Sequence, residues 1–235
     1  MPLNLSQFKL QRAVLEIRYA QSFLVWDHAG VVWQQLRTPF PEIKLRTAQP
    51  NQQTLSLSKK LTAQVALESS NLTAYSPISD AEPFAEACMS FFPLVLKQLE
   101  ISNLTRIGYR SFFQKSFETK QAASEFGFEQ LPYLRRKGKH FNIDGESRDP
   151  ELALRWEGDA TGILVRLQTI QQKLEADVPA DFESVESINV ERYVVVLDLD
   201  YYAHGNTSAA KFQPRALIES WSRLIRRDVE GFFNG

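Results

Sequence analysis

The same predicted order of secondary-structure elements occurs twice along this chain, and this repetition constrains the fold more than any other feature. Residues 13–20 read AVLEIRYA and alternate apolar and polar side chains, as a half-buried strand does. Residues 104–113, LTRIGYRSFF, begin the same order again, with Ile107 matching Ile17 at an offset of 107 − 17 = 90. In each half we predict a strand, a helix, several antiparallel strands and a second helix. The sequence therefore predicts a pseudo-duplicated α+β fold.

The first half supplies an amphipathic helix, a meander and a second helix. Residues 22–41 carry apolar side chains at three- and four-residue spacing, with Trp26 and Trp33 on the apolar face, and end at two prolines. Four short runs separated by polar turns then predict an antiparallel meander. These runs are residues 43–48, 54–59, 62–69 and 72–78. Residues 79–100 favour a helix with Cys88, the chain's single cysteine, on its apolar stripe, which indicates a buried thiol.

The second half repeats this plan with longer strands. Its further strands are predicted at residues 151–158, 161–175 and 191–203, and its helices at 119–132 and 213–233. Each half should lay its two helices on one face of a curved antiparallel sheet, because an apolar sheet face must be covered. We assign residues 1–102 to the first repeat and 103–235 to the second, and expect them to form one continuous structural unit. The uncovered sheet face is then the natural place to bind a partner.

Four segments, in this order and at these spacings, resemble a sporadically distributed family of uncharacterised bacterial proteins. They are AVLEIRY (13–19), FPEIK (40–44), TRIGYR (105–110) and VVLDLDYYA (195–203). Members of that family open with a Pro-Leu segment leading to a strand like AVLEIR, and carry a central segment close to TRIGLRYINR. Here RSFFQK replaces the usual Arg-Tyr-Ile-Asn-Arg run, and SQFKLQR replaces an Ala-Pro-Ile-Glu approach. The resemblance implies the fold and a bacterial origin, but no reaction.

Charge and hydropathy limit the partners of the whole chain. With 27 Lys+Arg against 28 Asp+Glu, the net charge of −1 gives no overall field to attract nucleic acid or an anionic membrane. The first residues carry charges where a signal peptide needs an unbroken apolar core, and no apolar run is long enough to span a bilayer. We therefore expect a cytoplasmic protein without a membrane partner.

Two arginines are candidate binding residues in the middle of the chain. Alternation places Arg106 and Arg110 on one face of their strand with Gly108 between them, which leaves open backbone between two guanidinium groups. Arg18 occupies the equivalent face of the first repeat. This arrangement suits an anion or a partner's carboxylates. Cross-strand salt bridges within the sheet are the alternative interpretation.

A second basic cluster lies in a predicted Gly-containing loop, residues 134–140. Its candidate binding residues are Arg135, Arg136, Lys137 and Lys139. Such a cluster can neutralise phosphates, with nearby aromatic rings available for base stacking. Acidic residues follow at once between 144 and 151. A solvated loop that neutralises itself is therefore the alternative interpretation.

Asp198 and Asp200 are candidate metal ligands, because residues two apart on a strand project from the same face. Such a pair can hold Mg²⁺ or Mn²⁺ if the fold brings a third acid close, with Glu157, Asp159 and Glu191 as candidates. The alternative is a strand whose apolar face is buried and whose acids face water. The sequence contains no Gly-x-Ser-x-Gly elbow, Walker loop, Gly-x-Gly-x-x-Gly motif or cysteine pair. We therefore expect no cofactor.

These observations favour a non-enzymatic binding protein that recognises a macromolecular partner through the open sheet face. A protein partner or a second copy of the chain is expected ahead of nucleic acid, and the last helix, with Trp221, Phe232 and Phe233, could supply a self-association surface. Sporadic distribution of similar proteins suits a bacterial defence, toxin-immunity or mobile-element system. Two alternatives stay open: a metal-dependent enzyme acting on nucleic acid or nucleotides through Asp198 and Asp200, and a non-catalytic nucleic-acid-binding saddle.

Overall fold

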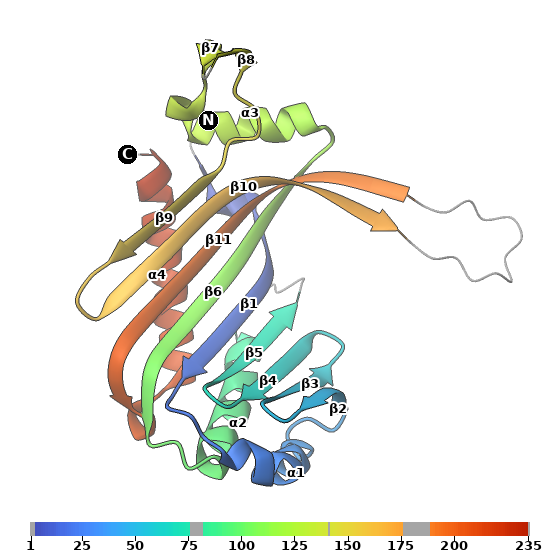
Figure 1. Ribbon diagram of the computed structural model, residues 1–235, viewed down its shortest axis with the longest axis vertical. Helices are drawn as coiled ribbons and strands as arrows, with labels where there is room; N and C mark the ends of the chain where they lie inside the picture. The colour runs from blue at the N-terminus through green and yellow to red at the C-terminus, as the bar shows by residue number, and fades with distance from the viewer. Residues whose placement is uncertain (1–2, 76–81, 141, 176–188, 235) are drawn as a thin grey trace, which may run out of the picture.

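The chain folds around one large antiparallel sheet (Figure 1). The computed structural model describes residues 3–75, 82–140, 142–175 and 189–234. These residues form four α-helices, a nine-stranded sheet and a separate two-stranded hairpin. The prediction of an α+β fold with an antiparallel sheet is confirmed. Within the described ranges, no helix combines the length and the apolar character needed to cross a bilayer.

The nine strands lie in the order β2-β3-β4-β5-β1-β6-β11-β10-β9. In that order they span Lys44–Gln49, Gln52–Ser58, Leu61–Ala66, Ser69–Tyr75, Lys9–Arg18, Asn103–Phe117, Asn189–Ser208, Thr161–Glu175 and Leu152–Glu157. Each neighbouring pair is antiparallel. The strands matched in the sequence, β1 and β6, pair at the centre, where Ile17 lies opposite Ile107.

The helices occur where the sequence predicted them. They are α1 Leu24–Leu36, α2 Glu82–Gln98, α3 Lys120–Gln130 and α4 Pro214–Asn234, with short 3-10 turns at Leu5–Gln7, Pro132–Leu134 and Ala209–Lys211. The side chain of Thr119 caps α3 by accepting a hydrogen bond from the Ala122 N–H at 3.1 Å. Cys88 is buried in α2 as predicted, and this burial raises the pKa of its thiol.

Contacts of α2 and α4 establish which way the strand residues point. The Phe84 ring of α2 lies 6.5 Å from the Tyr109 ring of β6, and the Trp221 ring of α4 lies 5.5 Å from the Tyr201 ring of β11. Figure 1 shows α2 and α4 behind the sheet. Because side chains alternate along a strand, the residues on either side of Tyr109 and Tyr201 face away from these helices. We call that side the outer face of the sheet.

The apolar face of α1 differs from the predicted one. Trp26 was predicted to face the core but is 53% exposed, whereas Val25 and Val32 are buried. The rotation of α1 is set by contacts with α2: His28 Nδ1 lies 2.6 Å from the Gln98 carbonyl oxygen, and Ser22 Oγ donates to the Leu99 carbonyl at 3.1 Å. These tertiary contacts, which helical spacing does not reveal, decide between two apolar stripes.

Tyr19 follows β1 and gives the fold a measurable dependence on alkaline pH. Its Oη donates to the Ala66 carbonyl at 2.8 Å and lies 2.8 Å from Ser70 Oγ. Burial raises the pKa of Tyr19 to about 12 from its ordinary value of 10.0. The unfolded chain therefore loses this proton first, so the contribution of Tyr19 to stability is complete below about pH 10 and falls as the pH rises toward 12.

We expect Tyr19→Phe to remove one late step from the absorbance titration of the native tyrosines. The variant should also lose stability less steeply than the wild type between about pH 10 and 12, because its phenyl ring has no proton to release. Denaturant unfolding at several pH values measures this slope. An unchanged late step in the variant would show that another tyrosine produces it.

Candidate functional site

A buried carboxylate held by two arginines lies at the centre of the outer face. Arg110 of β6 donates to Asp198 of β11 through Nε at 2.8 Å and Nη2 at 2.6 Å, one bond to each oxygen. Arg166 of β10 adds a bond from Nη1 to Asp198 Oδ2 at 3.0 Å. The Asp198 side chain is 3% exposed. Such a two-bonded arginine–carboxylate pair has a fixed geometry as well as charge attraction, so the three side chains are held in place.

A second set of ion pairs, centred on Arg106, extends this arrangement to β1. Arg106 donates through Nη1 to Glu16 Oε1 at 3.1 Å and through Nη2 to Asp200 Oδ2 at 3.0 Å. The same Glu16 oxygen accepts from Arg18 Nε at 2.7 Å. The structure therefore brings together the predicted residues Arg18, Arg106 and Arg110 with both predicted acids, through cross-strand ion pairs.

Two glycines allow long side chains to lie flat across the outer face. A Cβ on Gly108 would approach Arg106 Nη1 to 2.6 Å, and one on Gly162 would approach the Tyr202 ring to 2.5 Å. The Tyr202 hydroxyl in turn donates to Glu157 Oε1 at 2.6 Å. The prediction of open backbone at Gly108 is therefore wrong, because the Arg106 guanidinium covers this glycine.

In part of this network the guanidinium groups are more exposed than the carboxylates that hold them. The Arg110 side chain is 38% exposed above the buried Asp198, and the Arg18 side chain is 55% exposed beside a Glu16 that is 26% exposed. Arg106 is the exception, because its side chain is 19% exposed while its partners Asp200 and Glu16 are 19% and 26% exposed. The arginine network consists of Arg12, Arg18, Arg106, Arg110 and Arg166 with Glu16, Asp198 and Asp200. Five positive and three negative charges leave a surplus of 5 − 3 = 2. At Arg18, Arg110 and Arg166, solvent and any partner therefore meet mainly guanidinium groups.

Two members of the arginine network were missed in the sequence. Arg12 lies with its guanidinium carbon 3.5 Å from the centre of the Phe112 ring, and burial, followed by the charge of Arg110, lowers its pKa. Arg166 holds Asp198 from the neighbouring strand. Continued alternation along β1 and β10 would have placed both on the outer face. Their partners depend on strand register, which the sequence did not provide.

A hollow of about 640 Å³ opens on the outer face beside the network. Its charged lining consists of Arg18, Arg106, Arg155, Arg166, Glu157 and Asp200. Burial raises the pKa of Asp200, while Arg106 and Arg110 act in the opposite direction. The lining carries more positive than negative groups, which suits an anionic group of a partner.

The same contacts bear on the metal interpretation of Asp198 and Asp200. Both side chains project from the outer face of β11, but both are already bonded to arginines. Glu157, a candidate third ligand, accepts the hydrogen bond of Tyr202. Among the residues that the structure describes, no group of three or more His, Cys, Asp or Glu side chains is placed to hold a metal. This geometry favours salt bridges over a metal site.

The second basic cluster lies apart from the outer face, beside α3. Much of the predicted loop is a hairpin of β7 Lys137–His140 and β8 Ile143–Glu146, in which Lys139 lies opposite Asp144. Because residues 137–140 pair as a strand, the prediction of a Gly-containing loop is corrected there.

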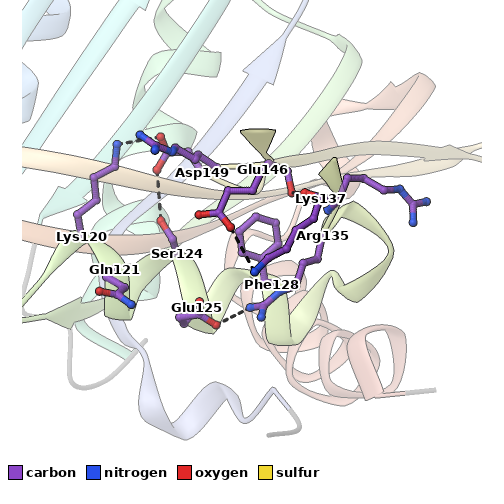
Figure 2. A pocket seen from close by; sticks show the side chains of 12 residues that line it. Lys120, Gln121, Ser124, Glu125, Phe128, Arg135, Lys137, Glu146 and Asp149 are labelled. Carbon is purple, nitrogen blue, oxygen red and sulfur yellow. Dashed lines mark hydrogen bonds and ion pairs between the residues drawn. The ribbon is translucent and has the colours of Figure 1, made fainter. Parts of the chain in front are cut away.

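A cavity of about 490 Å³ lies between α3 and this hairpin (Figure 2). Arg135 pairs with Glu125 and lies over the Phe128 ring, 5.0 Å from its centre. Lys137 Nζ lies 3.5 Å from a Glu146 oxygen. The remaining basic residues around the cavity are Lys120, which donates to Asp149 at 2.9 Å, Arg136, whose N–H donates to Ser147 Oγ at 2.8 Å, and Arg148. Ion pairs to Asp149, Glu125 and Glu146 thus neutralise three of the five basic side chains around the cavity, Lys120, Arg135 and Lys137, and the lining keeps a surplus of 5 − 3 = 2 positive charges.

The last helix carries only part of the predicted self-association surface. Trp221 is buried against the sheet, so it is not available to a partner. Phe232 is exposed and lies beside an apolar groove of about 130 Å³ between α4 and the strands β9 and β10. Trp156 of β9 borders the same groove and is 69% exposed. An exposed apolar surface therefore exists here, but it belongs to β9 as much as to α4.

Comparison with known proteins gives no assignment: no protein-family model matches the chain, and no curated protein is significantly similar to it. The family resemblance of the four sequence segments stays a prediction.

Proposed function

We propose that this protein is a non-catalytic binding protein that recognises another protein through the outer face of its sheet. The observation that carries the proposal is the arrangement of Arg18, Arg110 and Arg166, whose side chains are more exposed than the carboxylates that hold them. Guanidinium forks bind carboxylates with two parallel hydrogen bonds. Side chains already fixed by ion pairs lose less conformational entropy on binding. The surface therefore suits acidic side chains of a partner.

The aromatic rings of the outer face favour a protein partner over single-stranded nucleic acid. Bases bind such surfaces by stacking on exposed rings. Here Arg12 and Arg110 both lie over the Phe112 ring, with guanidinium carbons 3.5 and 4.5 Å from its centre. The Tyr202 ring lies across Gly162, with Arg106 4.8 Å from its centre. These rings already have arginine partners, so a base would have to displace an arginine to stack on them.

We propose further that the outer face belongs to a duplicated fold, with residues 1–102 and 103–235 as the two units and all four helices on the opposite side. The strand order supports this. Each of the central strands β1 and β6 has as its other neighbour the last strand of its own half, β5 or β11. An offset of 90 between equivalent residues places a two-fold axis at the pair Ile17 and Ile107, which are opposite each other.

The proposed function predicts that polyglutamate binds the outer face. We expect the double variant Arg18→Gln, Arg166→Gln to bind fluorescently labelled poly-L-glutamate roughly tenfold more weakly than the wild type, because two exposed guanidinium groups are lost. Fluorescence anisotropy at several salt concentrations measures this affinity, and the weak salt-sensitive binding should fade as salt is raised.

Arg223→Gln is the matched control, because it removes an exposed arginine from α4, which packs on the opposite side of the sheet. It should bind polyglutamate as the wild type does. Equal losses in the control and the double variant would contradict binding at the outer face. Tighter binding of a single-stranded oligonucleotide than of polyglutamate, abolished by the double variant, would replace the protein partner by nucleic acid.

A further inference from the structure

The two edges of the sheet, β2 and β9, differ in how they are protected. An unpaired edge exposes N–H and C=O groups to other strands, and proteins protect edges with lysines, prolines and bulges. β2 carries Lys44 and a break in register between Leu45 and Thr47. β9 has the sequence LALRWE, without lysine or proline, and pairs with β10 without a break. In the described part of the chain β9 has a neighbour on one side only.

The hydrogen-bonding direction along β9 follows from the turn that joins it to β10. The Gly158 N–H donates to the Thr161 carbonyl at 2.8 Å, which makes this a hydrogen-bonded pair in the β9–β10 register. Backbone groups in an antiparallel pair point alternately toward and away from the neighbouring strand. The N–H and C=O groups of Ala153 and Arg155 therefore point outward, where another strand can bind.

Apolar side chains continue to this edge on the helix-bearing side of the sheet. Leu154 and Trp156 of β9 line the groove of about 130 Å³ together with Val229 and Phe232 of α4. Exposed aromatic side chains next to an apolar groove are typical of protein interfaces. The edge thus offers both unpaired backbone groups and apolar surface.

We propose that β9 pairs with β9 of a second copy of this chain, so that the sheet continues across a two-fold axis. A two-fold interface uses the same patch twice, so the strand must be complementary to itself. With Ala153 opposite its own copy, Leu152 lies opposite Leu154, and Glu151, the residue directly before β9, lies opposite Arg155, each pair occurring twice. Opposite charges facing each other across strands stabilise the pairing, and like charges destabilise it.

The neighbouring registers lack this match within the extended strand. Centring the pair on Leu152 would place Arg155 opposite Asp149, but the positive φ of 52° at Asp149 takes that residue out of the strand. Centring the pair on Leu154 places Glu151 opposite Glu157, and centring it on Arg155 places that arginine opposite its own copy. Charge complementarity therefore favours a second copy of the chain as the partner of β9, and it favours the register centred on Ala153. In such a dimer the two outer faces lie on the same side of one continuous sheet, so a partner with two binding segments could be held by both at once.

Sedimentation equilibrium of the full chain tests the proposal, using variants in which the charges at residues 151 and 155 are reversed singly or exchanged. We expect a concentration-dependent dimer for the wild type, and a dissociation constant raised roughly tenfold by Glu151→Arg or Arg155→Glu alone, because each creates two like-charge pairs. Combining both substitutions restores opposite charges and should return the dissociation constant to within about threefold of the wild type.

Ala153→Pro provides a second test. Proline removes an N–H that points away from β10, so β9 keeps its bonds to β10 while pairing with a second copy is blocked. We expect loss of the dimer with little change in thermal stability of the monomer. Arg46→Glu on the opposite edge is the control and should leave the dimer intact. A wild type that stays monomeric at about 100 µM, or a charge-exchanged double variant as weak as the single ones, overturns the proposal.

Discussion

Replacing both Arg110 and Arg166 by methionine is expected to lower the free energy of unfolding by about 3 to 5 kcal/mol, because Asp198 would lose both charged partners while remaining buried. Methionine keeps most of the aliphatic bulk, so the loss reports mainly on the uncompensated carboxylate. Denaturant unfolding with an unchanged m-value measures it.

Removing the charge of Asp198 instead should lower the free energy of unfolding by a smaller amount. Asp198→Asn leaves two arginines without their carboxylate, but both are about one-third exposed and can turn toward water. We therefore expect Asp198→Asn alone to cost about 1 to 2 kcal/mol. Adding it to the double methionine variant should recover part of the lost stability, since the buried group is then neutral.

This recovery distinguishes a buried charge from ordinary packing loss. If the arginines contribute only through contacts of their aliphatic chains, the triple variant will be no more stable than the double variant. Arg223→Met on α4 is the matched control for removal of an arginine and should change stability by less than about 0.5 kcal/mol.

The faces of the strands could be predicted from the sequence, because side-chain direction alternates with a period of two in any strand. This period placed Arg106 with Arg110, and Asp198 with Asp200, and the structure has both pairs on the outer face. It predicted the four strands of the meander but not all of their ends: Leu67 and Glu68 form the turn between β4 and β5, Ser69–Asn71 belong to β5, and the predicted run 72–78 extends beyond the described residues. Local periodicity is therefore enough to predict which side chains share one face of a strand.

Which side chains meet could not be predicted in the same way. Arg166 bonds to Asp198 because β10 and β11 form a hairpin in one particular register, and Arg106 reaches Glu16 across 90 residues of sequence because β6 lies beside β1. Register and strand order are properties of the whole sheet. For the same reason the sequence did not distinguish the buried valines of α1 from its exposed Trp26, since α2 fixes the rotation of that helix.

The two proposed units share a core at Phe92, so their joint stability can be tested there. Phe92 of α2 is fully buried, with its ring 5.0 Å from that of Phe91 in the first unit and 5.4 Å from that of Phe212 in the second.

We expect Phe92→Ala to lower the free energy of unfolding by about 3 to 5 kcal/mol and the melting temperature by roughly 10 °C, because a large cavity opens between the units. Phe232→Ala, at an exposed position, should change stability by less than about 0.5 kcal/mol. If residues 1–102 and 103–235 form one cooperative unit, calorimetry should show a single transition that moves as a whole, since a cavity at their shared core weakens both at once. Two transitions, of which Phe92→Ala shifts only the first unit's, would instead mean that each unit is stable without the other.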